Sequence, residues 1–159
     1  MAKKFKTNAL RILDNHKIKY EIQEVGYDEN VDLIDKIKAK ATYPLANHLK
    51  TIVCQSEHGY LVACISIDRE IDLKALAKVS RNKKVELINL KDLFAITGYL
   101  RGGCSPVGLK KPFPVYFDDA VASMETILVS AGKRGYQMAV GKDELVGLLN
   151  GTVAKIARD

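Results

Sequence analysis

The apolar residues near the start of the chain follow two different periods. Thr7 can cap a helix that turns its leucines toward a core, and the pair His16-Lys17 ends it. Apolar and polar residues then alternate over residues 19–25, which predicts an edge strand that turns at Gly26. The three-to-four residue spacing of apolar positions after Val31 predicts a second helix that runs to about Lys40.

The middle of the chain predicts a β-hairpin followed by alternating short elements. The stretches TIVCQ (51–55) and YLVACISI (60–67) are β-branched and apolar, with a Glu-His-Gly turn between them, and a short helix after Pro44 precedes them. Asp72 caps a further predicted helix. A strand at 85–88 follows, and then a helix that opens at residue 89 or 91 and stops at Gly98.

The last third of the chain predicts more strands than helices. Strands are expected at 114–117, 126–130 and 137–140, and a helix at 145–149 closes at Gly151 before a final strand at 153–156. Strands and helices are mixed without strict βαβ alternation, so the fold class predicted is α+β. The sequence has no repeat, linker or low-complexity segment, which favours a single domain over residues 1–159.

Composition places the chain among ordinary globular proteins. Hydrophobic residues make up 47% and charged residues 28% of 159 residues, and the longest apolar run, 60–65, is too short to cross a bilayer. The N-terminus lacks the apolar stretch of a secretory signal, so a cytoplasmic location without membrane association is expected. The three cysteines and three histidines show no ligand spacing, so neither a metal nor another cofactor is expected; Cys54 and Cys64 lie in strand-like runs and are interpreted as small buried hydrophobes.

The net charge of +6 introduces a candidate partner. A basic protein attracts polyanions because binding releases counterions, so nucleic acid is plausible, although basic clusters also serve only to keep a surface solvated. The excess charge lies in four clusters: Lys3, Lys4 and Lys6; Arg81, Lys83 and Lys84; Lys110 and Lys111; Lys133 and Arg134.

Three features are not explained by packing. Lys50 stands at the entry of a strand in HLKTIV, where its ammonium would emerge beside Thr51. The loop TGYLRGGCSPVG at 97–108 offers a backbone platform for a ligand, since its glycines permit unusual conformations. The stretch VSAGKRG at 129–135 ends a strand in a small-residue turn with two cations. Solvated surface loops would account for each feature alone, and the chain has neither a G-x-S-x-G motif nor the spacing of a hydrolase triad.

Together these segments resemble one family from about Thr7 to Ala157. The TNAL helix, LKTIV, GYLRGGCSPVGLKK, VSAGKRG and a final AKIA, in this order, are similar to the YbaK/EbsC group of free-standing aminoacyl-tRNA editing proteins, which is related to the editing domain of bacterial-type prolyl-tRNA synthetases. The resemblance implies a mixed, barrel-like sheet flanked by helices. It also implies deacylation of mischarged tRNA in trans, most often Cys-tRNA(Pro), with no cofactor and with the tRNA CCA end and prolyl-tRNA synthetase as partners.

The resemblance assigns roles to individual residues. Lys50 matches the lysine on which the family depends, and a cation with an ordinary pKa of about 10.4 suits holding an ester carbonyl better than accepting a proton. In the mechanism of the family, the thiol of the substrate attacks its own ester and leaves as a cyclic thiolactone. Arg101, Lys133 and Arg134 are expected at the CCA phosphates. The implied substrate-binding set is Thr51, Gly102, Gly103, Cys104, Ser105, Pro106, Gly108, Ser130 and Gly132.

Several alternatives stay open at this point. Cys104 could act as a nucleophile, although no histidine adjoins it in sequence to activate it. Some relatives carry Tyr where this chain has Val25 or Tyr27, and Asp where it has Gln137, which leaves the preferred amino acid open. The chain could deacylate Ala- or Ser-tRNA instead, or bind tRNA or a synthetase without turnover.

Overall fold

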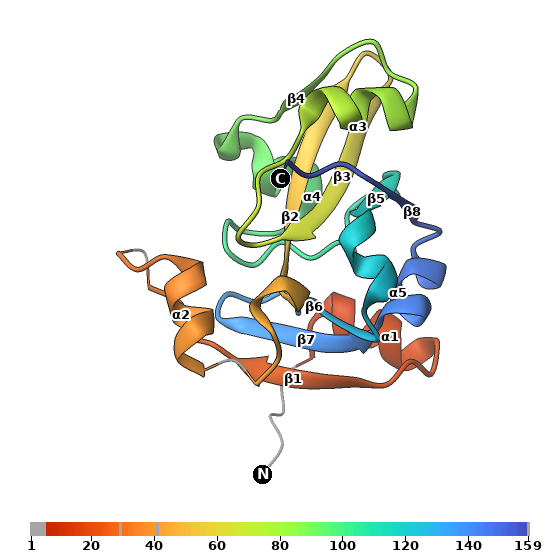
Figure 1. The fold of residues 1–159 in the computed structure, drawn as a ribbon. Coiled ribbons are helices and arrows are strands. Elements are labelled where there is room, and N and C mark those ends of the chain that lie inside the picture. The colour runs from red at the N-terminus through yellow and green to blue at the C-terminus, as the bar shows by residue number, and fades with distance from the viewer. Residues whose placement is uncertain (1–5, 29, 41, 159) are drawn as a thin grey trace.

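Two β-sheets organise the chain in the computed structural model, which describes residues 6–28, 30–40 and 42–158 (Figure 1). Lys3 and Lys4 of the first basic cluster lie outside these residues. A three-stranded antiparallel sheet has the order β1-β7-β6, and a five-stranded mixed sheet has the order β4-β2-β3-β5-β8. The strands are β1 (Tyr20–Glu24), β2 (Leu49–Ser56), β3 (Gly59–Ser66), β4 (Val85–Leu87), β5 (Val115–Asp118), β6 (Thr126–Ser130), β7 (Tyr136–Gly141) and β8 (Thr152–Ala154).

The α+β class is confirmed, but the sheet does not close into a barrel. The two sheets are linked in the described part of the chain by a single parallel bridge between His48 and Leu128. β2 forms its ladders with β3 and β4, so hydrogen bonding to β6 stops at this bridge. The mixed character of the larger sheet comes from β5, which runs parallel to both β3 and β8.

The predicted helices are present, most of them with the expected caps. Thr7 Oγ1 accepts from Leu10 N at the start of α1, and Asp72 Oδ1 accepts from Ala75 N at the start of α3. The α-helices are α1 (Asn8–Asn15), α2 (Leu33–Lys40), α3 (Leu73–Ser80), α4 (Leu93–Thr97) and α5 (Lys142–Leu148), and the 3-10 helices are η1 (Leu45–Asn47), η2 (Leu90–Asp92) and η3 (Asp119–Ser123). No pattern in the sequence predicted η3, because a short 3-10 helix has too few residues to show a period.

The predicted hairpin forms the centre of the larger sheet. β2 and β3 pair antiparallel with Lys50 opposite Ile65, and the buried second half of β3 packs into the core. Cys54 and Cys64 are fully buried, as the sequence predicted. This hairpin fixes the direction in which Lys50 leaves β2, because every residue of the strand is held in register.

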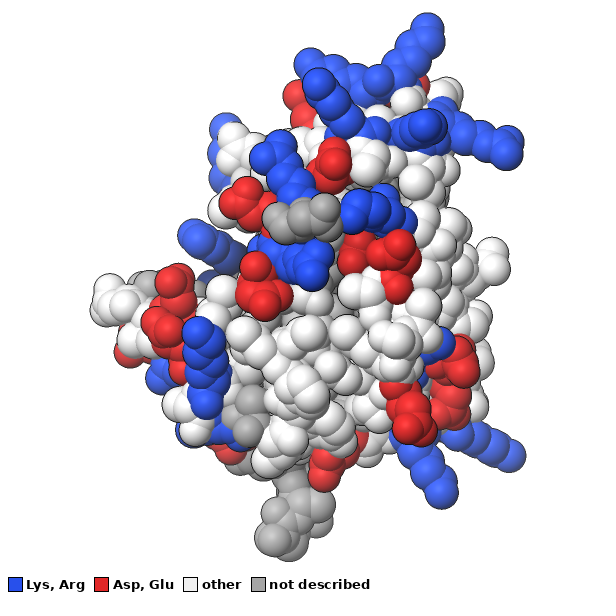
Figure 2. Space-filling view, viewed as in Figure 1, with Lys and Arg blue, Asp and Glu red and all other residues white. Residues whose placement is uncertain are grey.

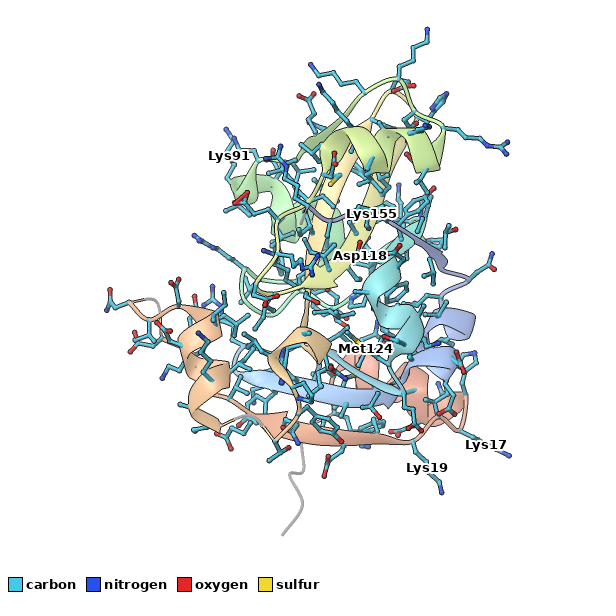
Figure 3. All side chains as sticks on the ribbon, viewed as in Figure 1. Lys17, Lys19, Lys91, Asp118, Met124 and Lys155 are labelled. Atoms are coloured by element: carbon cyan, nitrogen blue, oxygen red, sulfur yellow. The ribbon has the colours of Figure 1, made fainter. Side chains whose placement is uncertain are left out.

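One carboxylate ties the C-terminal segment to the larger sheet. Asp118, at the end of β5, accepts hydrogen bonds at Oδ1 from Ile156 N at 3.0 Å and Ala157 N at 2.9 Å (Figure 3). Its Oδ2 accepts from Ala120 N at 3.2 Å and so begins η3. The side chain is buried, so these three N–H groups replace the water that the carboxylate loses.

Asp118→Ala should lower the free energy of unfolding by about 2–3 kcal/mol, since it leaves two buried N–H groups without an acceptor. Chemical denaturation measures the change. Asp119→Ala is the matched control, because Asp119 is exposed and its loss should change stability by less than about 0.5 kcal/mol. Equal effects of the two substitutions would contradict this role of Asp118.

Candidate functional site

A cavity of about 190 Å³ lies where β2 meets the glycine-rich loop. Lys50 and Thr51 contribute from β2, Gly102 and Cys104 from the loop, and Ser130 from the end of β6. The structure thus brings together five of the residues that the sequence analysis placed in a site. The other lining residues are Val25, Leu33, Leu49, Gly135, Tyr136 and Gln137.

Lys50 is a partly buried cation in the wall of this cavity. Burial lowers the pKa of its ammonium, while the nearby carboxylates of Glu70 and Asp68 oppose that shift. Both acids are exposed and follow β3. Water solvates the Lys50 ammonium poorly, and the two carboxylates favour its charged form. A cation that is shielded from water in this way stabilises a developing negative charge more effectively than a fully solvated one.

The thiols near the cavity are held in their protonated form. Burial raises the pKa of Cys104 to about 11, and the Thr97 hydroxyl only partly offsets this shift. Burial likewise raises the pKa of Cys64 to about 12, against the effect of the Thr51 hydroxyl beside it. A nucleophilic cysteine requires a lowered pKa, so the environment of Cys104 is typical of a lining residue rather than of an activated nucleophile.

Two glycine-containing loops meet at the rim of the cavity. A Cβ on Gly103 would lie 3.1 Å from Arg134 N, and Arg134 Nε donates to the Arg101 carbonyl at 2.7 Å. On the other side, Gly135 O accepts from Val25 N at 2.8 Å and Gly26 N at 3.0 Å. Three segments that lie far apart in sequence are therefore held together, one pair by a side-chain to main-chain hydrogen bond and the other by two main-chain hydrogen bonds.

A second cavity of about 560 Å³ adjoins the first and shares Leu33, Gly102 and Gly135 with it. Tyr27 and Arg134 face one another here, with Arg134 Cζ 4.5 Å from the centroid of the Tyr27 ring. The remaining lining residues are Gly26, Asp28, Val31, Asp32, Lys36 and Arg101.

The other residues expected in the site lie around the two cavities rather than in their walls. Ser105 is buried, and its hydroxyl accepts from Val107 N at 3.2 Å, which shapes the loop. Pro106 and Gly108 line a separate hollow of about 360 Å³ between the loop, α1 and α5. Gly132 has a φ of +93° and packs against Tyr99. The ammonium of Lys133 lies 5.3 Å from the ring centroid of Tyr136.

A buried polar pair under the small cavity was not found from the sequence. His48 Nδ1 lies 2.7 Å from Gln137 Oε1, and both side chains are buried. Gln137 lines the cavity, so His48 positions it from behind. Burial lowers the pKa of His48, against the opposing effects of Gln137 and the Tyr43 carbonyl. The sequence separation of this pair left no local pattern that could have revealed it.

The predicted basic clusters are spread over the surface. Figure 2 shows Lys and Arg gathered at the end of the molecule that carries α3 and β4, where Arg81, Lys83 and Lys84 are exposed. Lys6 instead pairs with Asp14 at 2.8 Å. Within residues 6–28, 30–40 and 42–158, no helix is long and apolar enough to cross a membrane, and no group of three or more His, Cys, Asp or Glu is placed to hold a metal ion.

Sequence comparisons give a consistent set of relatives. The family model of the aminoacyl-tRNA editing domain matches residues 28–148. EbsC of Enterococcus faecalis, named as a candidate Cys-tRNA(Pro)/Cys-tRNA(Cys) deacylase, is 42% identical over 152 residues, which cover 95% of this chain and 93% of EbsC. The proline–tRNA ligase of Caldicellulosiruptor saccharolyticus is 26% identical over 118 residues, which cover 74% of this chain and 20% of the ligase.

Solved structures share the fold. The hypothetical protein APE2540 superposes with a TM-score of 0.85 at 16% identity, covering 96% of this chain and 100% of the other. A candidate trans-editing enzyme for prolyl-tRNA synthetase superposes with a TM-score of 0.80 at 19% identity, covering 95% and 93%. At these identities the likeness shows a common architecture.

Burial of His48 predicts a loss of stability in acid. The unfolded chain binds a proton at His48 as the pH falls below about 6.5, while the lowered pKa of the folded state resists that proton, so unfolding is favoured. We expect His48→Asn to reduce the difference in the free energy of unfolding between about pH 7.5 and about pH 5, measured by urea denaturation. His16→Asn, at an exposed position, should leave the wild-type difference unchanged. If both variants keep that difference, burial of His48 does not cause the acid sensitivity.

Proposed function

Because this chain belongs to the aminoacyl-tRNA editing domain family, we propose that it deacylates mischarged tRNA in trans, with Cys-tRNA(Pro) as its substrate. The observation that carries the proposal is the small cavity that contains Lys50 and borders a larger one. A cation next to a confined space, with room outside for a nucleotide, suits an ester that joins a small amino acid to a large RNA. The name given to EbsC supports cysteine as the amino acid.

Size explains why such an activity is needed and why this cavity suits it. A synthetase that must accept proline gains only about 10–200-fold discrimination against an amino acid of similar or smaller volume, so a second site has to remove the error. A cavity of about 190 Å³ has room for a small aminoacyl group such as a cysteinyl group. Its walls come from β2, β6, β7 and the loops, and hydrogen bonds between these segments hold them together.

Lys50 supplies charge stabilisation in the proposed mechanism. Its ammonium neutralises the negative charge that develops on the ester carbonyl oxygen when a nucleophile adds to the carbonyl carbon. Within the described residues, the N–H group of Cys104, which lines the cavity, forms no hydrogen bond to the protein, so we assign it as a donor to the same oxygen. Losing one donor of this kind typically costs about 10²–10³ in rate.

The substrate thiol is the proposed nucleophile. The sulfur of the cysteinyl group attacks its own ester carbonyl, the bond from that carbon to the ribose oxygen breaks, and the thiol proton ends on the ribose oxygen. The products are a cyclic thiolactone and uncharged tRNA. This route needs no protein nucleophile, which agrees with the raised pKa of Cys104. Attack by water on the same carbonyl would serve a substrate that has no thiol.

The proposed partners follow from this activity. The CCA end of aminoacylated tRNA enters the two cavities. The proposed cellular location is the cytoplasm, where translation occurs. Prolyl-tRNA synthetase is the proposed protein partner, because a segment of the Caldicellulosiruptor ligase is similar to this chain. A domain similar to part of that ligase would act on the same charged tRNA before it is used.

Lys50→Ala should slow the single-turnover deacylation of Cys-tRNA(Pro) by at least about 10²-fold, since it removes the proposed charge stabilisation. The measurement compares Cys-, Ala- and Ser-tRNA(Pro), with Lys19→Ala as an exposed lysine control just before β1. If the wild type releases Cys but neither Ala nor Ser from tRNA(Pro), the thiol route is supported. If it also releases Ala or Ser, attack by water replaces the thiol route as the mechanism. Binding without release of any amino acid would instead indicate a non-catalytic module.

Gly103→Val should abolish deacylation while the fold remains, because its side chain would push the loop away from the Arg134 backbone and open the cavity wall. Circular dichroism checks the fold and single-turnover deacylation checks the site. Gly147→Val is the control, since a side chain at this exposed glycine of α5 meets nothing within 4 Å. Normal activity of Gly103→Val would contradict the role of the loop in shaping the site.

A further inference from the structure

We propose that a lysine-lined groove between α3 and β4 binds the phosphate backbone of the substrate tRNA, at a distance from the CCA end. This inference rests on the proposed function, because it names a second contact with the same substrate. The groove includes Lys83 and Lys84 of a basic cluster to which the proposed mechanism gives no role. It lies at the end of the molecule where Figure 2 shows Lys and Arg gathered.

The groove is a hollow of about 490 Å³ that combines apolar and cationic residues. Its lining residues are Leu73, Ala77, Val85, Asn82 and the lysines Lys74, Lys78, Lys83 and Lys84, with neither Asp nor Glu among them. All four lysines are exposed, and within residues 6–28, 30–40 and 42–158 none of them forms an ion pair. Their charges are therefore available to an anion.

The lysines of α3 are placed against the preferences of the helix. Lys74 lies in the first turn, where the positive end of the helix dipole disfavours a cation. Lys78 follows four residues later on the same face, and like charges at this spacing repel one another. Both side chains line the groove, so a phosphate bound between them would relieve the repulsion.

The loop on the other side of the groove is held in place by the turn of the β2–β3 hairpin. The Glu57 carboxylate accepts from Lys83 N at 2.7 Å and from Lys84 N at 3.4 Å. Asn82 Oδ1 lies 2.7 Å from His58 Nδ1 in the same turn. The main chain of the loop is thus fixed, and Glu57 binds its N–H groups rather than the two ammonium groups.

β2 connects the groove with the cavity that contains Lys50. Ser56, at the end of β2, pairs with Val85, which lines the groove. A strand advances about 3.3 Å per residue, so Lys50 and Ser56 are about 20 Å apart. A single small anion cannot bridge this distance. A polynucleotide can, because nucleotides that precede the terminal one extend away from the ester at Lys50.

The chemistry of the groove suits a backbone rather than bases. A lysine ammonium is a compact point charge that contacts phosphates, and phosphate contacts orient a nucleic acid without reading its sequence. No aromatic residue lines the groove, so an unpaired base would find no stacking partner there. The groove therefore orients the tRNA while the chemistry takes place at Lys50.

The salt dependence of tRNA binding tests the groove directly. Lys78→Gln/Lys84→Gln should weaken the binding of uncharged tRNA(Pro), measured by fluorescence anisotropy at several salt concentrations. It should also reduce the steepness of log K against log salt by roughly 1.4–1.8, because each phosphate contact contributes about 0.7–0.9. Lys17→Gln/Lys19→Gln removes the same charge at the opposite end of the molecule (Figure 3) and should leave this steepness at the wild-type value.

Three outcomes of this comparison would overturn the proposal. One is an unchanged salt dependence in Lys78→Gln/Lys84→Gln. Another is an equal decrease in both double variants, which would indicate attraction by net charge alone. The third is intact tRNA binding together with lost binding to prolyl-tRNA synthetase, which would assign the groove to an acidic protein surface.

A truncated substrate separates this inference from the proposed function. The amino acid that the wild type removes is supplied on full-length tRNA(Pro) and as its 3′-adenosine ester, which has no phosphate. Lys78→Gln/Lys84→Gln should lower kcat/KM several-fold for the charged tRNA and leave it unchanged for the adenosine ester. An equal loss on both substrates would overturn the proposal. If no charged tRNA releases an amino acid, the proposed function is wrong, and binding of uncharged tRNA still decides whether the groove is.

Discussion

The close approach of two main chains determines the geometry of the whole site. Gly103 and Arg134 lie so near one another that an added methyl group would be 3.1 Å from a backbone nitrogen. Because both loops are attached to strands or helices of the core, this contact sets the distance between the edge of the small sheet and the loop that follows α4. The smaller cavity lies between them, with Gly102 and Cys104 on one side and Ser130 and Gly135 on the other, so this contact limits how far these walls can separate.

Such a site is maintained at a cost to stability. Partial burial disfavours the charged form of Lys50 and lowers its pKa, and burial of His48 disfavours its protonated form and lowers its pKa, which becomes unfavourable in acid. Neither arrangement contributes as much to folding as an apolar side chain would in the same place. Sites that bind or react commonly accept this cost, because their chemistry requires polar groups that water does not fully solvate.

The sequence predicted local structure better than long-range arrangement. The helix caps at Thr7 and Asp72 and the hairpin around Gly59 depend on residues that are close together in sequence. The sequence predicted them, and the structure confirms them. The separation into two sheets could not be read, since periodicity shows which face of a strand is buried but not which distant strand it joins. The parallel pairing of β5 with β3 and β8 is an example.

The same limit applies to the site. Lys50, Gly102, Cys104 and Ser130 stood out because their local motifs were unusual, and the structure brings them to one cavity. The contacts that complete the arrangement join residues with no shared motif. Tyr27 with Arg134 and His48 with Gln137 are pairs of ordinary residues whose meaning depends on the folded chain.

The position of the C-terminal segment has a consequence for the time at which the site is completed during synthesis. Arg158 N donates to the carbonyl of Glu70 at 2.7 Å, and Asp72 N donates to the carbonyl of Ile156 at 2.8 Å. Glu70 is one of the two acids that support the charge of Lys50. A nascent chain whose residues 156–158 are still inside the ribosome therefore lacks the two hydrogen bonds that hold the main chain at Glu70 and Asp72. The electrostatic environment of Lys50 is therefore completed only after residues 156–158 have emerged, although Lys50 itself emerges early.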